Sequence, residues 1–281
     1  MSNGFQKELK LLQEDILKLF MKKTCLRPSF ETEIKLRSEG HALIAGVDEV
    51  GRGALAGPIV AAAVVFDVEK KFEGLNRIID SKRLSKEDRE DIEKIVRREA
   101  ISIGIGSVEV SEIDKFGIGK ANILAFDRAL TNIEISCGRH CEKSSPKQSD
   151  ASVIPDSIGD PQRDCHDYQN SLAMTDKVNN KVDYVLIDGR NFRGFNYKFS
   201  CIEKGESKSI SIAAASIVAK VYRDNLMNEL HVYNSIYGFD THKGYGAKSH
   251  IEAIKTHGPS IYHRKSFLRK VLSQNNKFDL K

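Results

Sequence analysis

Two adjacent carboxylates, Asp48 and Glu49, lie at the end of an apolar run in the chain. The run spans 44–50, and a Gly/Pro-rich connection joins it to a second apolar run at 59–66, which predicts two buried strands and a tight turn. Burial of a bare carboxylate is too costly unless the group is paired or binds a metal. Because successive strand side chains face opposite ways, the two acids can share a site only where the strand ends. A solvated turn acid is the alternative, but the adjacent pair before Gly51-Arg52-Gly53 favours a site.

A third acid, Asp188, is the last residue of the apolar run 182–188 and is followed by a glycine. Functional residues of mostly parallel sheets collect where strands end, so Asp188 and Asp48 are expected to meet there. A further predicted strand at 196–202 leads directly into Lys204-Gly205-Glu206.

One more acid, Asp224, lies in an Ala- and Ile-rich segment from about 209 to 228 that predicts a long helix. At about 100° per residue, Asp224 falls on the same face as the apolar Ile217 and Val221. An acid on an apolar stripe needs a partner. That partner is either a nearby Lys or Arg or the metal site, and the pattern alone leaves both open.

Tyr245 lies between two glycines, directly after Lys243. A ring that neighbouring side chains do not crowd can stack on a base or sugar beside cationic residues. A tyrosine packed in a turn is the alternative, and composition alone does not separate the two interpretations.

Around these residues the pattern predicts an alternation of strands and helices. Ser85 opens a capping-box helix to about residue 99, a strand follows at 100–108, and a helix follows at about 119–133. Residues 1–40 are predicted to be an N-terminal extension with a short amphipathic helix from Leu9 to Phe20.

The stretch at about 136–181 is rich in Ser, Asp, Asn and Gln and poor in branched apolar residues. It is too polar to form a core and too long for an ordinary connection, so we interpret it as an exposed, disordered insertion. A zinc site is an alternative, but the cysteines and histidines lack the usual two-knuckle spacing, which favours free thiols. These residues are Cys137, His140, Cys141, Cys165 and His166.

The 281 residues suffice for one large domain or a domain with appendages. No apolar run approaches the roughly 20 residues of a membrane span, and the five irregularly spaced cysteines favour a reducing, cytoplasmic location. The net charge is +5, and the stretch from Thr241 to Lys281 holds nine Lys/Arg against Glu252 and Asp279, a local +7. A basic end suggests a polyanionic partner such as nucleic acid, with a solvated helical surface as the alternative.

Together these stretches resemble ribonuclease HII of the bacterial type, in the family's order and over most of residues 42–270. The Gly51-Arg52-Gly53 sequence favours this family over the related ribonuclease HIII, whose glycine motif carries Lys. The matching stretches are Gly46 to Gly53, Leu55 to Pro58, Asp80-Ser81-Lys82, Leu186 to Gly189, Lys204-Gly205, Ser211 to Asp224, Lys243 to Gly246 and His263 to Phe267.

The resemblance implies an α/β fold of the ribonuclease H-like type, with a central mixed five-stranded sheet flanked by helices and a helical C-terminal part. We expect the catalytic domain at 41–235 and a basic C-terminal helical segment at 236–281. The implied enzyme is a metal-dependent endonuclease that degrades the RNA strand of RNA–DNA hybrids. It also nicks DNA 5′ of an embedded ribonucleotide and leaves 3′-hydroxyl and 5′-phosphate ends.

Carried over residue by residue, Asp48, Glu49 and Asp188 match three of the family's four metal-binding acids. The fourth position departs from the family, because Glu206 stands where the pattern has Asp, and its carboxylate extends about 1.5 Å further. We expect Glu206 to complete the catalytic, metal-binding set by a rotamer change or to alter the metal preference. Asp224 is expected to give structural support near the site.

Carboxylate-only ligands select hard ions, so two Mg²⁺ or Mn²⁺ ions are the expected cofactors. The resemblance implies that the backbone of Gly51, Arg52 and Gly53 surrounds the 2′-hydroxyl, and glycine lets the backbone approach closely. Tyr245 is expected to stack on the sugar at the ribonucleotide–DNA junction. Lys82, Lys204 and Lys243 are candidates for contacts with the substrate's negative charge.

Two alternatives come from other classes. The substitution at Glu206 and the basic C-terminal segment suggest a hybrid-binding protein that lost catalysis, but clustered acids facing a phosphate backbone give a pure binder no advantage. Another nuclease or recombinase on the same fold is the second alternative. We further expect a monomer that binds nucleic acid and no membrane, with a sliding clamp as a further candidate partner.

Overall fold

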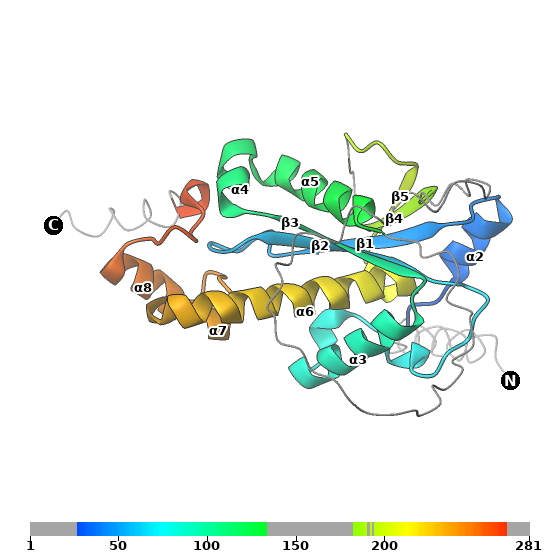
Figure 1. Cartoon of the computed structure of the whole chain (residues 1–281), viewed down its shortest axis with the longest axis horizontal. Helices are drawn as coiled ribbons and strands as arrows, with labels where there is room; N and C mark the ends of the chain where they lie inside the picture. Colours follow the sequence, from blue (N-terminus) through cyan, green and yellow to red (C-terminus); the bar gives the residue numbers. More distant parts are fainter. Residues whose placement is uncertain (1–26, 134–181, 190–191, 193, 269–281) are drawn as a thin grey trace, which may run out of the picture. The chain divides into compact units, whose positions relative to one another are not determined.

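The structure, a computed structural model, describes residues 27–133, 182–189, 192 and 194–268 (Figure 1). Three sequence predictions fall outside these residues. They are the amphipathic helix at 9–20, the polar insertion at 136–181 with its zinc alternative, and the part of the basic segment beyond 268.

The centre of the described chain is a mixed sheet with the strand order β3-β2-β1-β4-β5, which confirms the predicted five-stranded α/β architecture. β2 is antiparallel to both β1 and β3, whereas β4 is parallel to both β1 and β5. The strands are β1 (Ile44–Val50), β2 (Ile59–Val65), β3 (Ser102–Val108), β4 (Tyr184–Asp188) and β5 (Phe199–Ile202).

Helices cover both faces of the sheet, with α4 and α5 on one face and α3 and α6 on the other (Figure 1). The helices predicted at 85–99, 119–133 and 209–228 are confirmed, and the last continues to residue 233. The helices are α2 (Glu31–Ser38), α3 (Lys86–Glu99), α4 (Val110–Phe116), α5 (Ile118–Thr131), α6 (Ile210–Tyr233), α7 (Phe239–His242) and α8 (Lys248–His257).

Strand alternation divides the core into two apolar clusters. Val47 and Ala61 belong to the cluster that includes Phe126 of α5, whereas Val60 and Ala62 belong to the cluster that includes Ile217 of α6. Both faces of β1 and β2 are therefore buried, which explains why their sequences are almost continuously apolar.

Helix α6 lies directly against β1 because both elements carry small residues at their contact. A Cβ atom on Gly46 would lie 2.2 Å from the backbone carbon of Ser211, so only glycine fits there. Ser209 caps the helix by accepting from the Ile212 amide, and Glu33 of α2 accepts from the Ser211 amide and from the Ser209 hydroxyl. Glu33, a residue of the predicted N-terminal extension, thus provides a hydrogen-bond acceptor for a backbone amide in the first turn of α6.

The last part of the described chain is helical, as predicted, and packs against the connection between β1 and β2. Leu55 and Ala56 of that connection share an apolar cluster with Met227 of α6, Phe239 of α7 and Ile254 of α8. An isolated antiparallel bridge also joins Ala56 to His263. The boundaries of a separate C-terminal segment at 235/236 stay a prediction.

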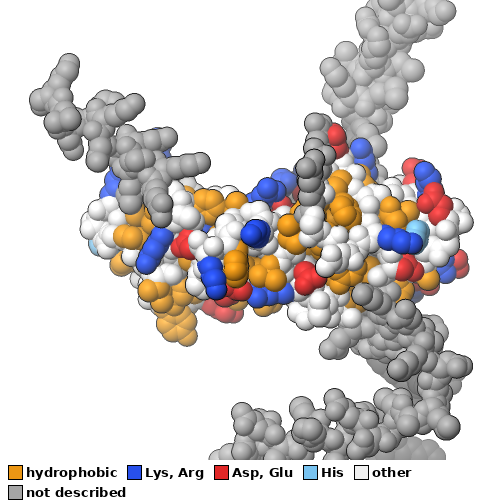
Figure 2. Space-filling view, turned by 90° about the horizontal axis from the view of Figure 1, so that it is seen from above, with side chains coloured by type: hydrophobic (Ala, Val, Ile, Leu, Met, Phe, Trp, Pro, Cys, Tyr) orange, Lys and Arg blue, Asp and Glu red, His pale blue; other side chains and the backbone are white. Residues whose placement is uncertain are grey.

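On the face of the molecule shown in Figure 2, Lys and Arg side chains are interspersed with Asp and Glu and with apolar side chains. Among the helices of the described ranges, none combines the length and the apolar composition that crossing a bilayer requires.

Candidate active site

Three of the predicted acids come together in space. Asp48, Asp188 and Glu206 each offer a carboxylate oxygen, and these oxygens all lie within 4.8 Å of one another. Asp48 comes from β1, Asp188 ends β4, and Glu206 lies in the short 3₁₀ turn η3 (Gly205–Ser207) that follows β5. Because β1, β4 and β5 are parallel neighbours, their C-terminal ends deliver the three side chains to one edge of the sheet.

Local backbone contacts hold these carboxylates. The Glu49 amide donates to Asp48 Oδ1 at 2.9 Å, and the Gly205 amide donates to Asp188 Oδ1 at 2.6 Å. Lys82 Nζ donates to Glu206 Oε1 at 2.8 Å. Each of the three carboxylates is therefore held by at least one protein donor.

Glu49 lies outside this group of three. β1 continues through Val50, so Glu49 projects on the α5 side while Asp48 projects on the α6 side. Its Oε1 is 3.5 Å from Arg52 Nη1, and it hydrogen-bonds with Asn122 of α5. Glu49 still lines the same cavity as Asp48. The two acids therefore line one cavity but project from opposite faces of β1, because the strand continues past both of them.

The electrostatics of the group disfavour three separate negative charges. Burial raises the pKa of Asp48 well above its ordinary value, and the charges of Glu49 and Glu206 raise it further. Burial also raises the pKa of Glu206, a hydrogen bond with Asp80 adds to the rise, and Lys82 opposes it. Buried like charges at this spacing need protons or a cation to offset them.

The donor set fits a hard divalent cation. All three ligands are carboxylate oxygens, and the group of described residues that could hold a metal contains no histidine or cysteine. Oxygen-only sites suit Mg²⁺ and Mn²⁺ better than zinc. The residues present are therefore consistent with the metal dependence expected from the sequence.

A cavity of about 360 Å³ opens beside Asp48 and brings together most of the predicted substrate contacts. Asp188 and Lys204 line a neighbouring hollow of about 550 Å³, and Lys82 and Glu206 border both. The first cavity is lined by Asp48, Glu49, Val50, Gly51, Arg52, Gly53, Ser81, Lys82, Arg89, Glu206, Ser216, Lys220 and Tyr245.

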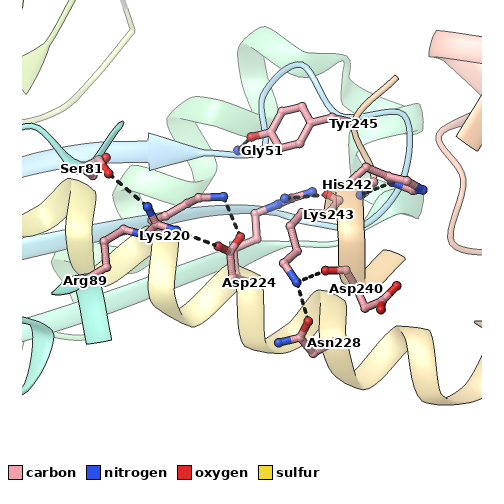
Figure 3. Close-up of polar contacts among 12 residues, drawn as sticks. Gly51, Ser81, Arg89, Lys220, Asp224, Asn228, Asp240, His242, Lys243 and Tyr245 are labelled. Carbon is pink, nitrogen blue, oxygen red and sulfur yellow. Dashed lines mark hydrogen bonds and ion pairs between the residues drawn. The ribbon is translucent and has the colours of Figure 1, made fainter. Parts of the chain in front are cut away.

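Gly51 and Gly53 of the Gly51-Arg52-Gly53 loop lie in different surroundings. Gly51 has a φ of +87°, and a Cβ atom there would lie 2.2 Å from Arg223 Nε. Gly53 has no heavy atom of the described chain within 4 Å of where its Cβ would be, so its backbone faces open space. The Gly51 amide donates to the Tyr245 hydroxyl at 3.2 Å, which joins the loop to the tyrosine (Figure 3). The loop thus presents bare backbone next to an aromatic ring.

Two buried arginines hold the connection between β1 and β2, a role that was not predicted from the sequence for either of them. Arg223 of α6 donates to the carbonyls of Ala56, Pro58 and Lys243. Arg264 donates to the carbonyls of Gly57 and Arg52. Both side chains are fully buried, so Arg264, which was counted in the basic C-terminal segment, supports the fold rather than the surface charge.

Asp224 pairs with cations and does not join the carboxylate group. Lys220 Nζ donates to its Oδ1 at 2.7 Å, and Arg89 Nη2 lies 4.0 Å from its Oδ2 (Figure 3). Of the two partners left open by the sequence, the structure favours the Lys/Arg partner. Lys243 lies nearby, and its Nζ donates to Asn228 and to the Asp240 carbonyl.

The sequence marks Asp80 and Ser81 as part of a matching motif but assigns neither of them a role at the site. Asp80 hydrogen-bonds with Glu206. Burial raises the pKa of Asp80, but the hydrogen bonds with Glu206 and with the Lys82 amide lower it by more, so the pKa lies below its ordinary value. Ser81 donates to Glu206 Oε2 at 3.4 Å and hydrogen-bonds with Ser216 at 2.9 Å. The Asp80-Ser81-Lys82 motif marked this segment, but nothing in it indicated which side chain would face the acids.

Comparisons with known proteins identify the family. The family model described as Ribonuclease HII matches residues 45–143 and 166–270. The ribonuclease HII of Clostridioides difficile (strain 630) is 38% identical over 234 residues, covering 83% of this chain and 73% of that protein. The ribonuclease HII of Chlamydia caviae is 39% identical over 262 residues, covering 92% of this chain and 97% of that protein.

Solved structures agree on the fold. The ribonuclease H2 of Pyrococcus horikoshii OT3 matches with a TM-score of 0.57 at 22% identity, over 84% of this chain and all (100%) of that one. Bst-RNase HIII, solved in complex with Mn²⁺, matches with a TM-score of 0.53 at 19% identity, over 84% and 71%. The expected ribonuclease H-like fold is therefore confirmed, and the chain belongs to the ribonuclease HII family of metal-dependent ribonuclease H endonucleases.

Proposed function

We propose that this ribonuclease H cuts the RNA strand of RNA–DNA hybrids and also nicks duplex DNA on the 5′ side of a single embedded ribonucleotide. The observation that carries the proposal is the position of the carboxylate group, because its members Asp48 and Glu206 line the same cavity as the exposed backbone of Gly53 and the ring of Tyr245. Acids that can hold cations thus lie beside a surface that can read a ribose. The products are 3′-hydroxyl and 5′-phosphate ends.

Asp48, Asp188 and Glu206 would hold the metal ions, and Glu49 would contribute from the rim of the cavity. We propose two divalent ions, and when bound they supply an activated water and neutralise the charge that develops on the leaving oxygen. Mn²⁺ in the Bst-RNase HIII structure supports a divalent metal of this type. The protein's own contribution is to hold the acids with backbone amides before any ion arrives.

Lys82 is proposed to neutralise the substrate's phosphate next to the acids. Its side chain is 77% exposed although its Nζ contacts the nearly buried Glu206. The hydrogen bond with Glu206 raises the pKa of Lys82, so the ammonium stays protonated at neutral pH. Lys204, on the border of the neighbouring hollow, is a second candidate for such a contact.

Recognition of the ribose is proposed to come from the Gly51-Arg52-Gly53 backbone, because a 2′-hydroxyl both donates and accepts hydrogen bonds. The open space around Gly53 permits a close approach. Tyr245 is 36% exposed and is held at its hydroxyl by the Gly51 amide, so its ring can stack on the sugar next to that loop. Together these residues would read the junction between a ribonucleotide and DNA.

The proposal is tested with an end-labelled DNA duplex that contains one ribonucleotide, incubated with Mg²⁺, with Mn²⁺ or with EDTA. An all-DNA duplex of the same sequence is the control. We expect one metal-dependent nick immediately 5′ of the ribonucleotide and no cut in the all-DNA duplex. Tight binding without a nick under every metal condition would favour the alternative of a hybrid-binding protein.

A further inference from the structure

Three histidines pack together behind Tyr245. His250 of α8 and His263 are 0% and 1% exposed, and their Nε2 atoms are 3.0 Å apart. The His242 ring stacks on the His250 ring with a centroid distance of 4.3 Å and an interplanar angle of 17°. Neither His250 nor His263 touches the proposed metal-binding acids, so the reaction described above does not use them.

The partners at the two ends of the pair determine where each proton lies. The Ser260 amide donates to His263 Nδ1 at 3.0 Å, so this nitrogen is an acceptor and the neutral His263 ring carries its proton on Nε2. At the other end, His250 Nδ1 lies 2.8 Å from the Tyr245 carbonyl oxygen, which can only accept. His250 therefore carries its proton on Nδ1, and its Nε2 accepts from His263 Nε2.

The hydrogen bonds thus run in one direction, from the Ser260 amide through His263 and His250 to the Tyr245 carbonyl, and we call this series the histidine relay. The contact at Ser260 and the contact at Tyr245 each fix one proton position, and both require His263 Nε2 to donate to His250 Nε2. The Ser260 hydroxyl, 2.8 Å from His263 Nδ1, can donate to the same acceptor. Any added proton would place two N–H donors against each other, either between the rings or at Ser260.

The surroundings favour the neutral form of both rings. Tyr237 and Phe239 pack against His263 with centroid distances of 4.7 Å and 5.6 Å, and Phe239 also contacts His250. Burial lowers the pKa of His250 to about 4, with His242 adding to the effect, and burial followed by the charge of His250 lowers the pKa of His263 to about 4. Burial also lowers the pKa of His242, while the charge of Asp240 raises it and the charge of Lys243 lowers it.

His242 fixes the same stretch of backbone from the other side. Its Nδ1 accepts from the Gly244 amide at 3.2 Å, and its Nε2 lies 2.7 Å from the Tyr237 carbonyl, so its proton lies on Nε2. The Tyr245 amide donates to the His242 carbonyl at 2.9 Å. Lys243 and Gly244 have φ values of 51° and 79°, a left-handed conformation that needs such support at the non-glycine residue.

We propose that His250 and His263 are positioning residues that set the placement of the Tyr245 ring through its backbone carbonyl, and thereby the preference for a ribonucleotide–DNA junction. The inference rests on the proposed contact of Tyr245 with the substrate. The paired neutral histidines orient the carbonyl from behind, while the Gly51 amide holds the hydroxyl at the far end of the same residue. The ring is thus fixed at both ends.

The proton positions are tested on the full-length wild-type protein by ¹⁵N NMR of its histidine side chains at neutral pH. We expect His250 to be the Nδ1–H tautomer and His263 the Nε2–H tautomer, each neutral. Assignment of the resonances uses the single variants of these histidines. A protonated ring, or Nε2–H on His250, would overturn the relay whatever the activity of the enzyme.

The functional consequence is tested with His250→Phe, which keeps a ring but removes both hydrogen bonds, and His250→Gln, whose carboxamide can donate and accept as the imidazole does. We expect His250→Phe to lose roughly 10- to 100-fold in kcat/KM on the single-ribonucleotide duplex. The loss on a long RNA–DNA hybrid should be smaller, and His250→Gln should restore much of the difference.

Tyr237→Phe is the matched control, because it removes a partly buried hydrogen bond from the Tyr237 hydroxyl to the Gly258 carbonyl in the same cluster and leaves the histidine relay intact. It should lower stability but leave the ratio between the two substrates unchanged. Equal losses of His250→Phe on both substrates would overturn the inference if Tyr245→Ala changes their ratio. If Tyr245→Ala itself leaves the ratio unchanged, the proposed contact of Tyr245 has failed, and the inference falls with it.

Discussion

Among the individual residues of the site, Glu206 combines several hydrogen-bond partners with a place in the carboxylate group. It shares a hydrogen bond with Asp80, accepts from Lys82 and Ser81, and lies within 4.8 Å of the oxygens of Asp48 and Asp188. Lys82 and Asp80 both contact the carboxylate of this glutamate. The longer side chain at this position is therefore accommodated by polar partners on the η2 segment (Ser81–Arg83) and the residue before it.

Charge and length at position 206 can be separated by two substitutions. Glu206→Gln keeps the length but removes the charge, so we expect cleavage to fall to a small fraction of the wild-type rate at saturating Mn²⁺ or Mg²⁺. Glu206→Asp keeps the charge and has the residue of the family pattern, so we expect most of the activity to remain. Initial cleavage rates of the single-ribonucleotide duplex measure both. Near-wild-type activity of Glu206→Gln would show that this carboxylate does not hold the metal.

A second pair of substitutions separates the ring of Tyr245 from its hydroxyl. Stacking of an aromatic ring is worth about 1–3 kcal/mol, so Tyr245→Ala should reduce nicking at a single ribonucleotide roughly 5- to 150-fold, and should reduce cleavage of a long hybrid less. Tyr245→Phe loses only the contact with the Gly51 amide and should retain most of the activity. The ratio of kcat/KM on the two substrates is the measurement, and an unchanged ratio in Tyr245→Ala would contradict junction reading.

At the scale of secondary-structure elements, the site depends on how β1, β4, β5 and α6 end or begin beside one another. Glu33 of α2 joins this arrangement because its Oε1 accepts from the Ser209 hydroxyl at 2.6 Å and the Ser211 amide at 3.2 Å. Its Oε2 has no hydrogen-bond partner among the residues that the structure describes. A buried carboxylate with one unsatisfied oxygen lowers stability when it is charged.

The structure therefore predicts a pH-dependent difference between wild type and Glu33→Gln. Burial raises the pKa of Glu33 above its ordinary value of 4.5, so the folded state binds the proton more tightly than the unfolded state does. The contribution of Glu33 to the free energy of unfolding must then fall as the pH rises from 4.5 through the folded-state pKa.

Glu33→Gln lacks this titration, so its stability relative to wild type should increase with pH over that range. Urea unfolding of both proteins at several pH values measures the difference, in which the shared titration of the active-site acids cancels. A difference that stays constant with pH would contradict the burial-driven shift.

Much of this element scale was accessible from the sequence. The apolar runs at β1, β2 and β4, the Ser85 cap of α3 and the Ala-rich α6 predicted the right elements because these patterns are local. Lys220 lies four residues before Asp224, so helical spacing alone could have indicated this partner. The Arg89 partner of Asp224 and the two arginine contacts with the 51–58 loop were not accessible, because they join residues far apart in the chain and a buried arginine has the same sequence signature as an exposed one. The separation of Glu49 from Asp48 depends on where β1 ends, and the apolar run did not define that boundary.

At the scale of the whole molecule, the charge distribution has to reconcile an acidic site with a polyanionic substrate. The net charge is +5, and the stretch after residue 240 carries a local +7, so the rest of the chain is slightly negative. Arg264 is buried within that stretch, so the charge available for a substrate comes from its other Lys and Arg residues. On the face shown in Figure 2 the basic side chains are interspersed with acidic ones.

Replacement of the last four basic residues by Gln should weaken binding of an uncleavable duplex without changing the rate of the bound enzyme. The slope of log K against log salt should fall by about 0.9 for each phosphate contact that is lost. The four substituted residues are Arg269, Lys270, Lys277 and Lys281. Salt titrations of binding measure the slope.

A matched control replaces four exposed basic residues of α2 and α3 by Gln and should leave the slope unchanged. An equal effect of the two quadruple variants would show that the C-terminal charge has no particular role. The control residues are Lys35, Arg37, Lys94 and Arg98.

The central claim is that the buried carboxylate group performs cleavage and does not merely complete the fold, and Asp48→Asn tests it most directly. The measurement compares wild type and Asp48→Asn for binding and for metal-dependent nicking of the same single-ribonucleotide duplex, with thermal unfolding as the check on folding. Because burial and neighbouring acids already disfavour the charge of Asp48, we expect the variant to fold and to bind as well as wild type. We expect it to make no nick with Mg²⁺ or Mn²⁺. Cleavage near the wild-type rate by the folded variant, or loss of folding together with binding, would contradict the assignment of Asp48 to the reaction.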